Sequence, residues 1–168
     1  EYFGEPVKGP DETSYTPVFA IFAVSLLMAL AMSWAAYGSL LTVRALEWFI
    51  AVAMCVLAIQ KLQDVESFSS MFLNYDLLAR RWVRYGYLYP FGEGVLMISG
   101  ALVWLAAPVA LFIGSVGAVS VIKAVYLDKR ELKCACVGDS SKVPLGFVSL
   151  TENLMMVAMG AWMLAKAL

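Results

Sequence analysis

Residues 17–37 read PVFAIFAVSLLMALAMSWAAY and contain no charged side chain. An α-helix rises about 1.5 Å per residue, so this stretch is long enough to cross the roughly 30 Å hydrocarbon core of a bilayer. A charge-free stretch of this length predicts a transmembrane helix, and the rest of the chain is therefore expected to fold in lipid.

The composition of the whole chain agrees with a membrane environment. Of its 168 residues, 62% are hydrophobic and 15% are charged, whereas soluble domains contain about 45–50% apolar and about 25% charged residues. The net charge is −1, and the lack of a basic excess disfavours nucleic-acid binding. Histidine is absent, which excludes catalytic triads and metal sites built on imidazole.

Four further apolar segments are each long enough to cross the membrane, so the sequence predicts an all-α polytopic bundle of five transmembrane helices. The expected spans are residues 17–37, 43–62, 87–106, 108–127 and 147–168. A tight reversal is expected near Pro108, because proline cannot continue the preceding helix and suits the first turn of the next. Four spans, with one segment re-entrant or interfacial, is the alternative. Residues 1–16 are expected to form a polar leader or linker, and residues 17–168 a single domain.

The basic residues predict the orientation of the bundle. In the five-span topology two of them, Arg44 and Lys166, lie on one face and ten on the other. The ten are Lys8, Lys61, Arg80, Arg81, Arg84, Lys123, Lys129, Arg130, Lys133 and Lys142. The positive-inside rule then places the amino terminus in the cytoplasm and the carboxyl terminus outside, with the bacterial cytoplasmic (inner) membrane as the expected location.

The segment 64–86 is too polar to cross the membrane, but its apolar residues recur every three or four positions, which predicts one amphipathic interfacial helix. The apolar stripe consists of Val65, Phe68, Phe72, Tyr75, Ala79 and Trp82. The residues expected to contact lipid headgroups are Arg80, Arg81 and Arg84. The aromatic residues expected at the water–lipid boundary are Tyr85, Tyr87 and Tyr89. The alternative is an ordinary cytoplasmic helix packed on the bundle.

Several ionisable residues fall inside the predicted spans or at their ends, where the topology places them at a similar depth. This predicted intramembrane polar layer consists of Lys61, Asp64, Glu93, Lys123 and Glu152. A charge at the bilayer centre costs about 3 kcal/mol, so such groups are expected to face a partner or a cavity. Either they neutralise one another and fix the register of the helices, or they form a polar pocket that binds or relays a ligand.

The loop before the last span contains two thiols one residue apart, Cys134 and Cys136, in the basic stretch DKRELKCACVG. Two neighbouring thiolates can bind a soft cation such as Cu(I), Zn(II) or Hg(II). They can equally close a strained disulfide that is easily reduced and suited to exchange. A chance pair of cysteines is the third interpretation. Cys55, in the middle of an apolar span, is expected to be a small packing residue.

Four motifs in the chain resemble those of the MauE/DoxX-like family of small redox-associated bacterial membrane proteins. They are K-L-x-D at 61–64, Y-P-x-x-E at 89–93, K-C-x-C-x-G at 133–138 and T-E-N at 151–153. The resemblance covers about residues 45–168 and implies thiol–disulfide handling, as in maturation of the disulfide-rich small subunit of methylamine dehydrogenase. By position it implicates Lys61, Asp64, Tyr89, Pro90, Glu93, Cys134, Cys136 and Glu152. Some relatives carry a heavy-metal-associated domain ahead of the membrane part.

Three hypotheses about function follow. In the first, Cys134 and Cys136 are redox thiols that act on a partner protein, and thiol–disulfide exchange is the reaction if the chain is an enzyme. In the second, the same cysteines bind a soft metal, with Cu(I) as the possible cofactor or cargo. In the third, the chain is a structural accessory subunit of a larger membrane complex. The expected partners are membrane lipid and a protein, which would be a redox partner, a metal-binding domain or other subunits.

Overall fold

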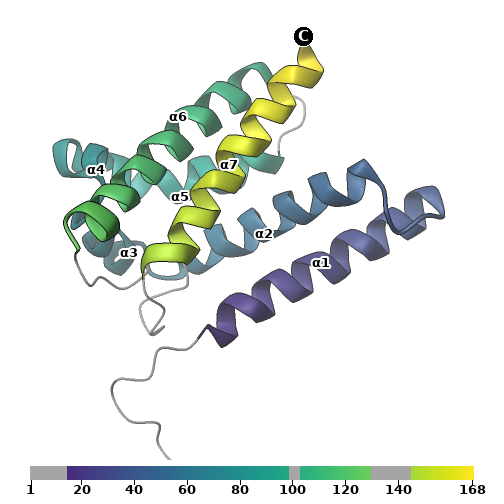
Figure 1. Cartoon of the computed structure of the whole chain (residues 1–168), viewed down its shortest axis with the longest axis horizontal. Helices are drawn as coiled ribbons and strands as arrows, with labels where there is room; N and C mark the ends of the chain where they lie inside the picture. Colours follow the sequence, from purple (N-terminus) through teal and green to yellow (C-terminus); the bar gives the residue numbers. More distant parts are fainter. Residues whose placement is uncertain (1–14, 99–102, 130–144) are drawn as a thin grey trace, which may run out of the picture.

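The computed structural model describes residues 15–98, 103–129 and 145–168, and every regular element within these ranges is helical (Figure 1). The helices are α1 (Thr16–Tyr37), α2 (Val43–Gln63), α3 (Val65–Leu73), α4 (Leu77–Arg81), α5 (Val83–Ile98), α6 (Val103–Val121), the π-helix η2 (Ile122–Leu127) and α7 (Leu145–Ala167).

Four helices of the described chain are long and apolar enough to cross a membrane, namely Thr16–Tyr37, Val43–Gln63, Ala106–Leu127 and Leu145–Ala167. The protein is therefore a polytopic membrane helix bundle, as the sequence predicts. The short helix α5 has 16 residues and rises about 24 Å, less than the thickness of the hydrocarbon core. Five spans are thus not confirmed: by length and composition four of the described helices qualify, and α5 is a shorter helix between the second and third of them.

The fourth span, expected at residues 108–127, coincides with the long apolar helix Ala106–Leu127, but the tight reversal expected near Pro108 is wrong. The third span, expected at residues 87–106, overlaps α5, described to Ile98, and the first residues of α6, described from Val103. Pro108 lies inside α6 instead of at a reversal. The proline removes one backbone hydrogen bond, a loss that membrane helices tolerate where neighbouring groups satisfy the freed carbonyl.

The predicted single helix over residues 64–86 is also wrong, because the segment divides into α3, α4 and the start of α5. The break between α3 and α4 is stabilised by Asp76. Its Oδ1 accepts hydrogen bonds from the backbone nitrogens of Leu78 at 2.9 Å and Ala79 at 2.8 Å. These bonds cap the N-terminus of α4 and favour a new helix start. Burial raises the pKa of the Asp76 carboxyl above its ordinary value of 3.8.

The apolar stripe of this segment packs on the bundle, which favours the alternative interpretation over an interfacial helix. Its buried members are Phe68, Phe72, Tyr75 and Ala79, whereas Trp82 is exposed. Two of the tyrosines expected at the membrane boundary, Tyr85 and Tyr89, also lie in the core, and only Tyr87 is exposed. The ring centroids of Phe72 and Tyr89 are 4.8 Å apart. The prediction is wrong for these two tyrosines, because aromatic content alone does not separate a core cluster from a boundary belt.

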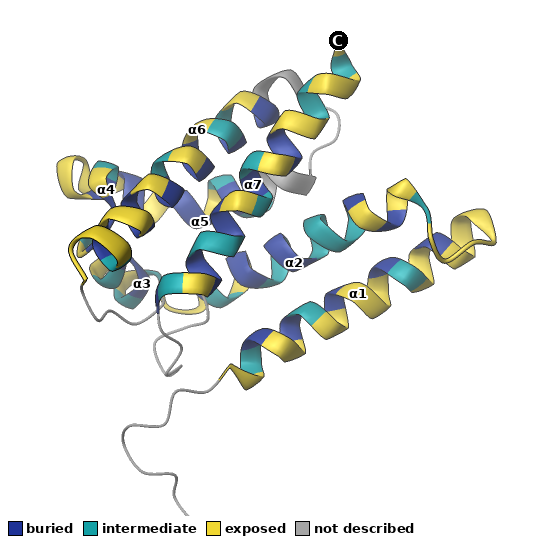
Figure 2. Cartoon of the chain, viewed as in Figure 1, coloured by how far each residue is buried: buried dark blue, intermediate teal, exposed yellow. Residues whose placement is uncertain are grey.

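Helix α1 packs mainly against α2 through a narrow stripe. The buried residues of α1 are Val18, Ile21, Ser25, Ala29 and Ser33, spaced three or four apart as expected for one helix face. Large apolar side chains cover its other faces, including Phe19 at 73% and Leu27 at 66% exposure (Figure 2). Such a surface is suited to contact with lipid.

The order of the helices brings distant parts of the chain to the same end of the bundle. Helix α2 ends, and α7 begins, beside α3 and η2, whereas the carboxyl terminus and the α1–α2 connection lie at the opposite end (Figure 1). We call the first the α2-terminal end. Residue pairs far apart in sequence meet near it.

Candidate functional site

A buried ionic cluster of Lys61, Glu93 and Glu152, here called the ionic triad, joins three helices near the α2-terminal end. Lys61 comes from the last turns of α2, Glu93 from α5 and Glu152 from α7. The Lys61 ammonium donates hydrogen bonds to Oε2 of Glu93 and to Oε1 of Glu152, and each of the three residues is 1% exposed. Burial of this kind is rare for ionised side chains and requires partners.

Aromatic rings surround the lysine of the triad. The Lys61 nitrogen lies 5.2 Å from the ring centroid of Tyr89 and 5.9 Å from that of Phe68, within the range of cation–π attraction. The Tyr89 hydroxyl and Oδ1 of Asn153 are 3.3 Å apart in a hydrogen bond that the hydroxyl donates. Pro90 is buried next to Tyr89 within α5. Two aromatic rings therefore lie close to the buried ammonium group of the triad.

The triad contains three of the five residues of the predicted intramembrane layer. Asp64 is exposed and caps α3 by accepting a hydrogen bond from the Ser67 backbone nitrogen at 2.9 Å. Lys123 is exposed on η2. The structure thus places these two exposed residues outside the buried triad.

The predicted thiol site falls on Cys134 and Cys136, which lie outside the described residues. The segment that contains them joins η2 to α7, so both of its flanking helices meet at the α2-terminal end. Cys55 is half-buried in α2, as a packing residue would be. Arg80, Arg81 and Arg84 are exposed, in keeping with a surface role.

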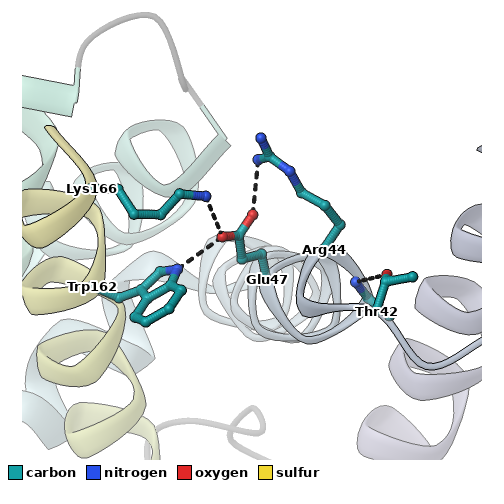
Figure 3. A network of polar contacts seen from close by, with 6 residues as sticks. Thr42, Arg44, Glu47, Trp162 and Lys166 are labelled. Atoms are coloured by element: carbon teal, nitrogen blue, oxygen red, sulfur yellow. Dashed lines mark hydrogen bonds and ion pairs between the residues drawn. The ribbon is translucent and has the colours of Figure 1, made fainter. Parts of the chain in front are cut away.

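A second polar network, which the sequence did not predict, surrounds Glu47 at the opposite end of the bundle (Figure 3). The Glu47 carboxylate accepts hydrogen bonds from Trp162 Nε1 at 2.8 Å, Lys166 Nζ at 2.8 Å and Arg44 Nη1 at 2.9 Å. Thr42 caps the start of α2 by accepting a bond from the Ala45 backbone nitrogen at 3.0 Å. In the sequence, Trp162 and Lys166 are one helical turn apart, which places both donors on one face of α7. This spacing could have indicated the network.

A groove of about 750 Å³ runs between α1, α2 and α7 beside the Glu47 network. Its lining includes five sulfur-containing side chains, which are Met28, Met32, Cys55, Met159 and Met163. Among the described residues no group of three or more histidine, cysteine or carboxylate side chains could hold a metal ion. Any soft-metal site in this groove would therefore need thioether ligands in addition to the single thiol of Cys55.

A family model matches most of the chain. The model described as "Methylamine utilisation protein MauE" covers residues 39–166, a range that contains the ionic triad, the Glu47 network and both cysteines of the C-x-C motif. Helix α1 lies outside the match, as the resemblance implied. No curated protein and no solved structure matches the chain.

Proposed function

The chain belongs to the MauE family, and on this premise we propose that it exchanges disulfides with a partner protein through Cys134 and Cys136. The observation that carries the proposal is the pair of cysteines one residue apart in a basic segment between η2 and α7. Neighbouring Lys129, Arg130 and Lys133 favour the thiolate, which is the reactive form.

The exchange proceeds in two steps, and in each step one disulfide bond forms as another breaks. The thiolate of one cysteine attacks a disulfide of the partner, so a mixed disulfide forms and one partner thiolate leaves. The thiolate of the other cysteine then attacks the mixed disulfide, closes the Cys134–Cys136 bond and releases the second partner thiolate. The partner is reduced by two electrons and this chain is oxidised by two; the reverse sequence introduces a disulfide into the partner.

Thiol trapping tests this proposal in a Cys55→Ser background, where only the two motif cysteines remain. Purified protein is equilibrated in glutathione buffers of graded potential and then alkylated. We expect a reversible change between two labelled thiols and none. Cys134→Ser and Cys136→Ser should each trap a mixed disulfide instead. Two labelled thiols at every potential would exclude the redox function.

A soft-metal function is the second candidate, because sulfur-containing side chains line the groove between α1, α2 and α7. In this alternative Cys134 and Cys136 bind Cu(I), and the methionines of the groove offer further soft ligands. Cu(I) titration of the wild type and of the Cys134→Ser/Cys136→Ser variant separates the two functions. Equal affinity in both proteins would exclude the cysteines as metal ligands.

The family of the chain indicates a first partner, and the distribution of its basic residues indicates its orientation in the membrane. The family description names methylamine utilisation, so a disulfide-containing protein of that process is the first partner to test. The basic residues at the α2-terminal end favour a cytoplasmic position for that end in a bacterial inner membrane. If the complex with its partner works equally well after both cysteines are replaced, the chain is a structural accessory subunit instead.

A further inference from the structure

The polar network around Glu47 carries a net positive charge at one end of the groove between α1, α2 and α7. The charged side chains that line this groove are Arg44, Glu47 and Lys166, so two cations face one carboxylate. The exposed fraction of the side chain is 55% for Arg44 and 44% for Lys166, but 11% for Glu47. One donor of each cation is bonded to Glu47 (Figure 3), whereas a guanidinium has five donors and an ammonium three. The network can therefore bind a further anion from outside.

Aromatic side chains place the charged end of the groove at the depth of the lipid headgroups. Trp162 is 45% exposed beside Lys166, whose nitrogen lies 5.9 Å from the centroid of the indole ring. Trp48 also lines the groove and stacks on the exposed Tyr37 at the end of α1, with ring centroids 6.0 Å apart. Tryptophan and tyrosine are enriched at the water–lipid boundary of membrane proteins. An anion bound by Arg44 and Lys166 would therefore lie at that boundary.

From its charged end the groove extends along α2 toward the middle of the membrane. Its lining on this helix runs from Arg44 to Val56, which corresponds to about 18 Å of helix. Half of the hydrocarbon core is about 15 Å thick, so the groove has roughly the depth of one lipid leaflet. Beyond the charged end it is lined mainly by apolar and sulfur-containing side chains, such as Met28, Met32 and Cys55. Methionine is flexible and apolar, so these walls can adapt to an acyl chain.

A second hollow, of about 540 Å³, lies beside the groove between α2 and α7. The two hollows share Glu47, Met159 and Trp162 in their lining. An apolar stripe of α2 lines the second hollow but not the groove, and it consists of Val43, Leu46 and Ile50. At 3.6 residues per turn, this stripe lies on the opposite side of Glu47 from the groove-lining Arg44 and Trp48. One charged site thus has an apolar hollow on each side, which matches a headgroup with two acyl chains.

We propose that the groove, the second hollow and the Glu47 network form a binding site for one anionic diacyl phospholipid. Arg44 and Lys166 hold its phosphate, and one acyl chain lies in each hollow, on either side of Trp162. A concave, mostly apolar lining with a few polar groups is typical of small-molecule sites, and basic pockets between transmembrane helices bind anionic headgroups in other membrane proteins. The site includes neither Cys134 nor Cys136, so it does not depend on the proposed disulfide exchange.

Native mass spectrometry of the full-length protein in a mild detergent tests the site by titration with phosphatidylglycerol and phosphatidylcholine of identical acyl chains. We expect the first phosphatidylglycerol to bind about fivefold more tightly, the usual contribution of one basic charge near anionic lipid. Arg44→Gln and Lys166→Gln should each abolish this preference, because either change makes the network neutral. Glu47→Gln should instead raise it, again about fivefold, because the carboxylate no longer offsets a cation. Loss of a purely structural bond would not tighten lipid binding.

Two further variants separate this site from other lipid contacts. Arg80→Gln/Arg81→Gln removes two exposed arginines of α4 and should leave the preference unchanged. Ala158→Phe fills the second hollow and should weaken binding of phosphatidylglycerol but not of its single-chain lyso form. Equal affinity of the wild type for the two phospholipids, or a preference that survives both Arg44→Gln and Lys166→Gln, would overturn the proposal. A neutral lipid that co-purifies and that phosphatidylglycerol does not displace would also overturn it.

Discussion

Gly117 of α6 lies so close to Asn153 of α7 that a Cβ atom on the glycine would be 1.9 Å from Oδ1 of the asparagine. Gly114 and Gly160 make similar approaches across the same interface. Small residues allow membrane helices to pack closely, and here the close packing positions α7. Asn153 accepts the hydrogen bond from Tyr89, so the α6–α7 contact supports the wall of the ionic triad.

Gly117→Ala is therefore expected to lower the free energy of unfolding by about 1–3 kcal/mol, the usual cost of overpacking a well-packed interior. Asn153 cannot move freely, because its Nδ2 donates to the Ser149 carbonyl at 2.7 Å. Thermal unfolding in a mild detergent measures the effect. Ser115→Ala, at an exposed position of the same helix, is the control and should change stability little. Equal stability of the two variants would contradict the close contact.

Removal of the lysine from the triad should be much more costly than removal of an exposed one. Lys61→Met removes the ammonium group that is bonded to two buried carboxyl groups, and breaking a buried pair in this way costs about 3–5 kcal/mol. Lys166→Met should have a small effect, because Lys166 is half-exposed and Glu47 keeps Arg44 and Trp162 as partners. The measurement is the unfolding temperature of each variant.

The stability lost in Lys61→Met should be recovered in part when Glu93→Gln and Glu152→Gln are added to it. The reason is that a neutral cluster of similar size needs no counter-charge. A triple variant less stable than Lys61→Met alone would show that the carboxyl groups stabilise the fold in another way.

The apolar runs of the sequence predicted the long helices well, because the length and hydropathy of a span are local properties. Helix α1 was expected at residues 17–37 and occupies Thr16–Tyr37. The ionic triad was predicted in part by the same physics, since Lys61, Glu93 and Glu152 are too costly to leave unpaired in lipid. The exclusion of Asp64 and Lys123 from the triad was not predicted, because the local course of the chain decides which side chains reach it.

Features that depend on long-range contacts were missed. The burial of Tyr85 and Tyr89 requires α3 to pack on α5, and hydrophobic periodicity cannot report which apolar faces meet. Trp162 and Glu47 are 115 positions apart in the chain, so the residues near Glu47 in the sequence do not indicate its partners on α7. The break at Asp76 was also missed, because an Asp can cap a helix or lie on its solvent face.

Asp76 should make the stability of the protein depend on pH. Its pKa in the folded state is raised by burial above the ordinary value of 3.8, so the folded protein binds more protons than the unfolded chain between these two values. The contribution of this group to stability is therefore complete below about pH 4 and is lost as pH rises through the folded-state pKa. Asp76→Asn keeps an oxygen acceptor and should abolish this loss.

The measurement is the unfolding temperature of the wild type and of Asp76→Asn from acidic to neutral pH. Asp76→Ala is the matched variant, since it removes the charge and also the bonds to Leu78 and Ala79. It should be less stable than Asp76→Asn by about 1 kcal/mol at every pH, the typical value of an N-cap. Parallel pH profiles of wild type and Asp76→Asn would contradict the role of burial.

The orientation of the bundle is testable through the cysteines themselves. If the α2-terminal end faces the cytoplasm, Cys134 and Cys136 should resist a membrane-impermeant maleimide in intact spheroplasts and react after lysis. Leu168→Cys, in a chain without the three native cysteines, provides the control at the opposite end, where the residue is 92% exposed. It should react before lysis. Labelling of Cys134 and Cys136 from outside would invert the predicted topology, and it would place the disulfide exchange where oxidised partner proteins are made.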